Sequence, residues 1–165
     1  MATTTSGTAK VTLPADNQIL ITRVFNAPAR LVWRAYTTPE LIRRWWSGGH
    51  GPVIVAEVDL RVGGKWRYVL DAGGFEVGFH GEYREIQEPE RLVNTEAYEG
   101  IPDADDHAAL VTVTLTEKDG QTFLEMLIEH VDQADRDAHV NSGMEGGMQV
   151  SWDHLEVIAA ELADA

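Results

Sequence analysis

The stretch that decides the fold is the last one, residues 144–162, MEGGMQVSWDHLEVIAAEL. Its apolar side chains recur every three or four residues, which places them on one face of a helix: Met144, Met148, Trp152, Leu155, Ala159 and Leu162. Before it lie roughly eighty residues with the pattern of consecutive antiparallel strands. One helix laid across one curved sheet cannot easily fill the concave side at the density of a protein interior. The sequence therefore predicts a pocket between sheet and helix.

The rest of the chain predicts the sheet itself. Gln18–Phe25 is expected as the first strand, and two short helices follow it, with Asn26 and Thr38 as their N-caps. Further strands are expected at Val53–Val58, Lys65–Leu70, 77–83, Arg91–Tyr98, 111–115 and 124–130, and a short helix over Asp132–Asn141. The expected fold class is α+β: a curved antiparallel sheet of six to seven strands wrapped around a long C-terminal helix, with two short helices after the first strand.

Length and composition narrow the class of protein. A chain of 165 residues suits one domain, expected over residues 16–165, with a disordered lead-in over residues 1–15. Because the sequence has no cysteine, disulfides, thiol nucleophiles and cysteine metal sites are excluded. The N-terminus lacks the apolar core of a signal peptide, and no apolar run reaches the ~20 residues of a membrane span. We therefore expect a cytoplasmic protein without membrane insertion.

The net charge of −14 narrows the choice of partner. Such a field repels phosphate backbones and anionic lipid headgroups, so nucleic acid and acidic membranes are poor candidate partners. A small hydrophobic or aromatic molecule meets no such opposition.

Several short motifs, none specific alone, occur together in an order that resembles a known family. They are VFNAP (24–28), LVWRA (31–35), PELI (39–42) with Trp45-Trp46, GGKWRY (63–68), FHGEY (79–83), Glu85-Ile86, PERL (89–92), Thr95-Glu96, DRD (135–137), SGM (142–144) and SWD (151–153). On these residues the chain resembles the START-like, or SRPBCC, superfamily. Within it, the chain resembles the bacterial AHSA-type proteins, which are similar to the C-terminal domain of the activator of the ninety-kilodalton heat-shock protein's ATPase.

The resemblance implies a helix-grip fold, in which a curved sheet grips the C-terminal helix and leaves a cavity between them. It implies no particular reaction, and it does not by itself imply chaperone work. In such a fold the inward aromatic and methionine side chains are core and cavity wall at once. Tyr and Trp bring polar tips to a pocket, and Met adapts to irregular shapes. The candidate ligand-binding residues are Trp45, Trp46, Trp66, Tyr68, Phe79, Tyr83, Met126, His130, Met144, Met148 and Trp152.

Two ionisable residues are candidates for acid–base chemistry. His130 ends the inner face of its strand, and Glu96 would serve if its face of the strand points inward. Glu85 points inward too unless a bulge intervenes. The ordinary alternatives are a His130 hydrogen-bonded to the following helix and glutamates paired with surface arginines. The spacing of His130, Asp137 and His139 matches no standard metal pattern, so neither a metal nor a cofactor is expected.

The sequence lacks the motifs of nucleotide binding and of nucleophilic hydrolysis. Gly64-Lys65 has no phosphate-loop spacing, and no G-x-S-x-G elbow surrounds Ser47, Ser142 or Ser151. The favoured function is a small-molecule binding protein. The alternatives are a cyclase, dehydratase or hydrolase-type enzyme using His130 or an inward Glu, and a co-chaperone-like interaction module. An edge strand or the tryptophans near the second helix would allow a homodimer.

Overall fold

The computed structural model describes residues 8–164. The elements in chain order are β1 (Lys10–Thr12), β2 (Gln18–Phe25), α1 (Ala29–Thr37), α2 (Pro39–Trp45), β3 (Val53–Val58), β4 (Lys65–Asp71), β5 (Glu76–Gln87), β6 (Arg91–Tyr98), the 3-10 helix η1 (Ala104–His107), β7 (Ala109–Lys118), β8 (Gln121–Glu129), α3 (Gln133–Val140) and α4 (Met144–Ala163). The strands described form one antiparallel sheet in the order β1-β2-β8-β7-β6-β5-β4-β3.

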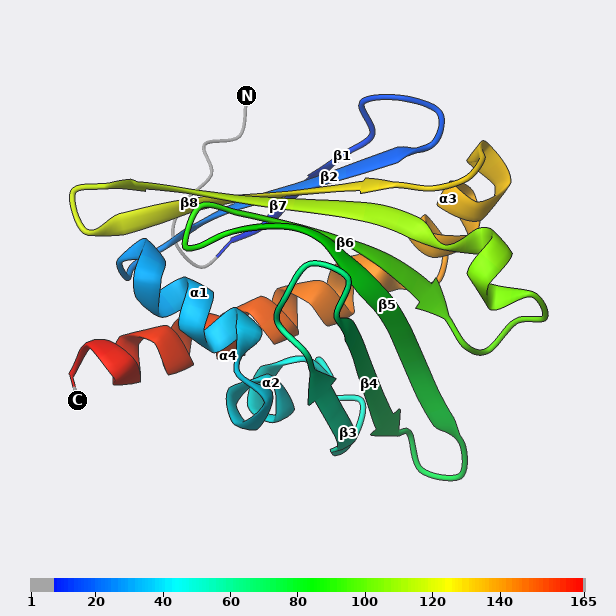
Figure 1. Ribbon diagram of the computed structural model, residues 1–165, viewed down its shortest axis with the longest axis horizontal. Coiled ribbons are helices and arrows are strands. Elements are labelled where there is room, and N and C mark those ends of the chain that lie inside the picture. Colours follow the sequence, from blue (N-terminus) through cyan, green and yellow to red (C-terminus); the bar gives the residue numbers. More distant parts are fainter. Residues whose placement is uncertain (1–7, 165) are drawn as a thin grey trace.

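The sheet is curved, and α4 crosses its concave side (Figure 1). Helices α1 and α2 lie beside α4 on that same side, while α3 sits at the far end of the sheet, next to the end of β8. The predicted α+β helix-grip architecture is confirmed, including the two short helices after the long first strand. None of the helices within residues 8–164 is both long and apolar enough to span a membrane.

The sheet has eight strands in the described residues, where the sequence predicted six or seven. The additional strand is β1, which falls inside the stretch expected to be a disordered lead-in. It pairs antiparallel with β2, with Lys10 opposite Thr22 and Thr12 opposite Leu20. The expected lead-in is therefore wrong for Lys10–Thr12, and its first seven residues lie outside the described part of the chain.

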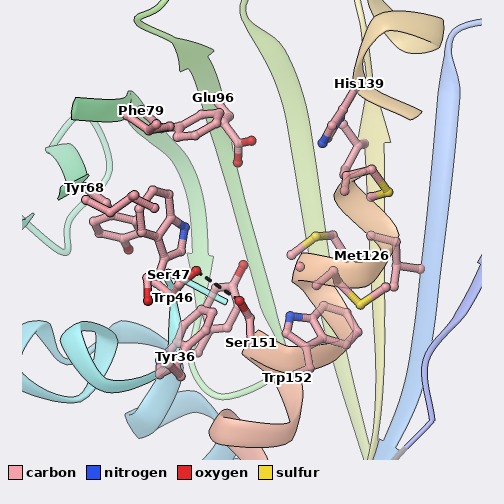
Figure 2. Close-up of a pocket in the computed structure, with 18 of the residues that line it drawn as sticks. Tyr36, Trp46, Ser47, Tyr68, Phe79, Glu96, Met126, His139, Ser151 and Trp152 are labelled. Atoms are coloured by element: carbon pink, nitrogen blue, oxygen red, sulfur yellow. Dashed lines mark hydrogen bonds between the residues drawn. The ribbon is translucent and has the colours of Figure 1, made fainter. Parts of the chain in front are cut away.

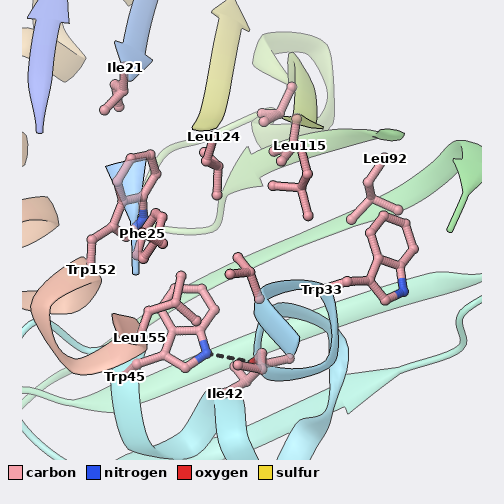
Figure 3. Packing of buried hydrophobic residues seen from close by; sticks show 14 of the residues in the cluster. Ile21, Phe25, Trp33, Ile42, Trp45, Leu92, Leu115, Leu124, Trp152 and Leu155 are labelled. Carbon is pink, nitrogen blue, oxygen red and sulfur yellow. Dashed lines mark hydrogen bonds between the residues drawn. The ribbon is translucent and has the colours of Figure 1, made fainter. Parts of the chain in front are cut away.

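The predicted helix caps differ in detail. The N-cap of α1 is Pro28 rather than Asn26, and the first N–H of that helix, on Ala29, donates to the Glu117 carboxylate of β7 at 2.7 Å. Thr38 does occupy the N-cap of α2, but its hydroxyl donates to the Arg34 carbonyl at 2.6 Å instead of accepting from the helix. These ends are fixed by packing, since Trp33, Ile42 and their neighbours are buried against the sheet (Figure 3).

We call residues 152–163 of α4 its C-terminal half, and this half is packed into the core. Trp152, Leu155 and Ile158 are buried there, and the Trp152 ring lies 5.8 Å from that of Phe25 (Figure 3). Arg23, only 1% exposed, anchors the same half from β2: its guanidinium donates to Asp153 at 2.8 Å and to Glu156 at 2.9 Å. The N-terminal half of α4 stands over the sheet with methionines that are only partly buried, and this leaves room beneath it.

A local break in the sheet sets the geometry of the site. Trp66 on β4 pairs with Gly81 on β5, and its indole Nε1 reaches past that glycine to donate to the Thr95 carbonyl on β6 at 3.1 Å. A side chain at position 81 would collide with that carbonyl. Because the Thr95 hydroxyl also accepts from the Glu82 N–H at 2.9 Å, the β5–β6 ladder is interrupted at this point. Glu96 follows directly on β6.

Candidate functional site

A cavity of about 330 Å³ lies under the N-terminal half of α4, between that helix, the concave face of the sheet and the end of α2. We call it the inner chamber. Figure 2 shows side chains from β4, β5, β6, β8, α1 and α4 converging on it. Its wall consists of Ile21, Tyr36, Trp45, Trp46, Ser47, His50, Trp66, Tyr68, Leu70, Val77, Phe79, Tyr83, Leu92, Asn94, Glu96, Met126, Ile128, His139, Ser142, Gly143, Met144, Gly147, Met148, Ser151 and Trp152.

A second space of about 400 Å³, the outer chamber, adjoins the first at the end of the sheet near η1 and α3. Its wall consists of Val77, Phe79, Glu96, Tyr98, Ile101, His107, Ala109, His130, Asp135, Ala138, His139 and Ser142. Five of these residues also line the inner chamber: Val77, Phe79, Glu96, His139 and Ser142. Because the two spaces share walls, they form one elongated site with Glu96 and His139 at the junction.

The structure brings the sequence-predicted ligand residues together. Ten of the eleven line the inner chamber, and the eleventh, His130, lines the outer one. Trp45 and Trp152 are mainly core, because each is nearly inaccessible and the Trp45 indole donates to the Ala35 carbonyl at 2.9 Å. That these residues contact a ligand stays a prediction.

One wall of the inner chamber is an aromatic cluster, which we define as Trp46, Trp66, Tyr68 and Phe79. The Trp46 ring meets Tyr68 and Phe79 edge to face, with centroids 5.4 and 5.6 Å away, and Trp66 lies 4.7 Å from Tyr68. Edge-to-face packing holds the rings in fixed relative orientations. The cluster therefore forms a shaped wall, while Met126, Met144 and Met148 supply adaptable surface from β8 and α4.

Glu96 is the acidic side chain at the centre of the site. Its carboxylate points into the space between the aromatic cluster and Met126 (Figure 2). No group within residues 8–164 donates a hydrogen bond to it, and burial raises the pKa of this carboxyl to about 7. Burial is the main cause of the raised pKa of Tyr36 on α1, and the negative charge of Glu96 raises it further. The inward orientation of Glu96 that the sequence left open is thus the one observed.

Glu85 takes the opposite orientation. A bulge between Tyr83 and Glu85 shifts the register of β5 against β6, so two successive side chains leave the inner face. Glu85 is exposed and accepts from the Arg91 guanidinium at 2.9 Å. It is therefore a surface ion-pair partner, which was the ordinary alternative.

His130 and His139 form a pair at the outer chamber. The His130 Nε2 and His139 Nδ1 atoms lie 3.0 Å apart, so one ring donates and the other accepts. Burial lowers the pKa of His139 to about 4 and also lowers the pKa of His130, which keeps both rings neutral near pH 7. His130 thus bonds to the following helix, as its ordinary interpretation predicted, although its buried Nδ1 has no partner in the described residues.

The acidic residues at and within α3 cap the helix or form an ion pair with a neighbouring arginine. The Asp132 carboxylate accepts from the Asp135 N–H at 2.9 Å and caps the helix, and Asp137 accepts from the Arg136 guanidinium at 2.8 Å. Within the described residues, no three histidine or acidic side chains are grouped closely enough to hold a metal ion.

Sequence reasoning missed several wall residues. Tyr36, Asn94 and His139 all face the site. Tyr36 was recognisable from the apolar side of its helix, and His139 was considered only as a metal ligand. Asn94 precedes Glu96 on the same face of β6, so fixing the orientation of one would have placed both. His139 reaches the site because α3 folds back beside the end of β8, which brings its ring to His130, nine residues earlier in the chain.

The raised pKa of Glu96 predicts a pH-dependent stability. Between pH 5 and 7 the unfolded chain has lost a proton that the folded chain retains, so the free energy of unfolding falls as pH rises through this window. Replacing Glu96 with Gln removes this penalty. We expect Glu96→Gln to be more stable than the wild type by about 2 kcal/mol at pH 8, and about equal to it at pH 4.5. Urea denaturation at the two pH values measures this difference, and an equal gap at both would contradict it.

Comparison with protein families gives the site a context. The model of the family described as "Activator of Hsp90 ATPase homolog 1-like protein" matches residues 26–160, from the end of β2 to near the end of α4. The chain belongs to this family. The match covers both chambers except for parts of β2, and the resemblance stated from the sequence motifs is confirmed.

Solved structures similar to this family member come from several bacteria. A protein from Rhodobacter sphaeroides is 26% identical with a TM-score of 0.85, and the match covers 93% of this chain and 99% of that one. One from Chromobacterium violaceum is 27% identical with a TM-score of 0.73, covering 86% and 96%. One from Nitrosomonas europaea is 23% identical with a TM-score of 0.80, covering 93% and 100%. None of the three is named for a ligand or a reaction, and no curated protein matches the chain. The family supports a ligand-binding or co-chaperone-type domain.

Proposed function

We propose that this protein binds an apolar or aromatic small molecule in the inner chamber, between the sheet and α4. The observation that carries the proposal is the cavity of about 330 Å³ with its aromatic cluster on one side and methionines on the other. A wall of rigid rings facing flexible thioethers favours flat apolar molecules without demanding one exact shape. The serine, tyrosine and asparagine groups on the wall are few enough to orient such a ligand without excluding it.

Burial of apolar surface supplies enough free energy for such binding. At roughly 25 cal/mol per Å², a ligand that hides ~300 Å² gains on the order of 7 kcal/mol before the costs of ordering are subtracted. The half of α4 over the chamber has only partly buried methionines, and it is held by hydrogen bonds between Gln149 and the Ala9 backbone and from Ser151 to the Trp46 carbonyl. Residue 143, a glycine with φ of +85°, stands at the start of that half.

An acid–base enzyme is the second candidate, and Glu96 is the observation that favours it. A carboxyl whose pKa lies near 7 exchanges protons readily at neutral pH, and it faces the ligand space directly. It lacks, within the described residues, the hydrogen-bonded partner that orients a general base. Turnover of a bound compound in the wild type, lost in Glu96→Gln without loss of binding, would establish this role.

Fewer observations support a co-chaperone-like module or a homodimer. A filled groove with apolar surface elsewhere would favour an interaction module, and an open chamber of about 330 Å³ does not meet that condition. The sheet edges at β1 and β3 would be available for dimerisation. A cytoplasmic location remains an inference from the cysteine-free sequence.

Native mass spectrometry of the protein purified from its own host tests the proposal. We expect a mass excess from a non-covalently bound compound, released on denaturation and identified as an apolar or aromatic molecule by extraction. Repeated preparations with no bound mass, together with no binding from a host metabolite extract, would overturn the proposed function.

A further inference from the structure

The two chambers have an unbalanced set of ionisable groups. Their described walls contain acids, histidines and tyrosines but no Lys or Arg. Asp135, on the outer wall, already holds the His107 Nδ1 at 2.8 Å. Glu96, which lines both chambers, has no ion pair among the described residues. It is therefore the one wall carboxylate in this part of the chain that faces the ligand space without a counterion.

The other groups that face Glu96 do not supply the missing positive charge. His139 and His130 have lowered pKa values and are neutral near pH 7. Burial raises the pKa values of Tyr36, Tyr68 and Tyr83, so these hydroxyls stay neutral as well. His50 lines only the inner chamber, where its ring lies against Gly147 of α4. His107 has a raised pKa, but its nearest charge is its partner Asp135 in the outer chamber.

The aromatic cluster adds a second feature that suits a cation. Aromatic faces carry partial negative charge and attract ammonium groups. Phe79 lines both chambers together with Glu96 (Figure 2). The Trp46 ring contacts both Phe79 and Tyr68 edge to face. A carboxylate beside aromatic side chains offers an ammonium a charge partner and a weakly polar wall at the same time. The net charge of −14 also draws cations toward the surface.

We propose that the ligand is a basic amine: an apolar or aromatic body in the inner chamber, with its ammonium nitrogen at Glu96 where the chambers meet. This inference rests on the proposed function and names its ligand class. Pairing with the ammonium compensates the charge of Glu96, a group that burial otherwise disfavours in its ionised form. An anionic ligand of the same shape would meet that carboxylate with no cation to offset it.

Three probes with one indole body separate the possibilities: tryptamine as the cation, 3-ethylindole as the neutral counterpart and indole-3-propionate as the anion. Their affinities are measured by isothermal titration calorimetry at pH 8 and pH 5 for the wild type and Glu96→Gln. Glu125→Gln is the matched control, because it removes the same charge from β8 on the opposite face from Met126.

In the wild type at pH 8 we expect tryptamine to bind at least tenfold more tightly than 3-ethylindole, and indole-3-propionate to bind most weakly. Glu96→Gln should remove the tryptamine advantage over 3-ethylindole, while Glu125→Gln should leave that advantage unchanged. Tryptamine affinity should also fall toward pH 5 in the wild type as Glu96 gains its proton, and stay flat in Glu96→Gln.

Tighter binding of 3-ethylindole than of tryptamine, or a tryptamine affinity unchanged in Glu96→Gln, would overturn the amine inference while leaving the binding function intact. Failure of all three probes to bind would count against the proposed function itself, and the amine inference would fall with it.

Discussion

Replacing Trp152 with alanine is expected to lower the free energy of unfolding by about 4 kcal/mol. Trp152 is 3% exposed, its ring packs on Phe25, and it lies where the half of α4 that is fixed to the sheet begins. The truncation removes apolar contact and leaves a hole that its neighbours cannot close, since Arg23 holds the adjoining turn through Asp153 and Glu156. Chemical denaturation measures the change.

Val157→Ala is the matched control on the same helix, because that side chain is 56% exposed and its loss should cost less than about 0.5 kcal/mol. A cost below about 1 kcal/mol for Trp152→Ala would contradict the packing described. Trp152 also contributes to the inner chamber wall. In the fraction of Trp152→Ala that remains folded, we therefore expect weaker ligand binding, and an unchanged affinity would argue against that wall.

Filling the inner chamber from α4 is expected to produce the largest effect on binding. Met148 is partly buried and faces the chamber, so Met148→Trp places an indole where the ligand would lie. We expect a loss of affinity of at least about 100-fold, equivalent to about 2.7 kcal/mol. Met148 is only partly buried and lies beside open space, so the larger side chain has room and folding should survive.

Val157→Trp is the control for this substitution, since it adds the same side chain to an exposed position of α4. The probe is 3-ethylindole, or the compound extracted from the host protein if one is found. Wild-type affinity in a folded Met148→Trp variant would show that the ligand binds elsewhere.

The predictable part of the fold is the part that local periodicity encodes. The face of α4 follows from its three- and four-residue spacing, and β2 and β7 follow from their alternating burial. Strand β1 has only three residues and gains its order from pairing with β2, so composition alone suggested a disordered lead-in. Asn26 and Thr38 were expected as side-chain caps, but the Glu117 carboxylate of β7 caps α1, and packing fixes the start of α2.

The sequence predicted which residue types line the candidate site, but it did not predict which way the Glu96 side chain points. Strand β6 buries both faces, because Leu92 and Val93 are each nearly inaccessible, and alternation therefore could not tell which way Glu96 points. The regular pairing of β6 with β7 decides the matter, because it places Glu96 opposite Ala109 on the same face as Leu92 and Asn94. The outer chamber was missed because it depends on η1 and α3 meeting the end of the sheet, which is a contact between segments far apart in the sequence.

The central claim is that guest-sized space lies beneath the N-terminal half of α4, and methionine methyl NMR tests it most directly. The chain has four methionines, and three of them, Met126, Met144 and Met148, line the inner chamber. With ¹³C-methyl methionine and 3-ethylindole as the probe, we predict nuclear Overhauser contacts from the indole protons to these three methyl groups. Saturating probe that leaves all three signals unmoved, or that contacts none of them, would contradict the account.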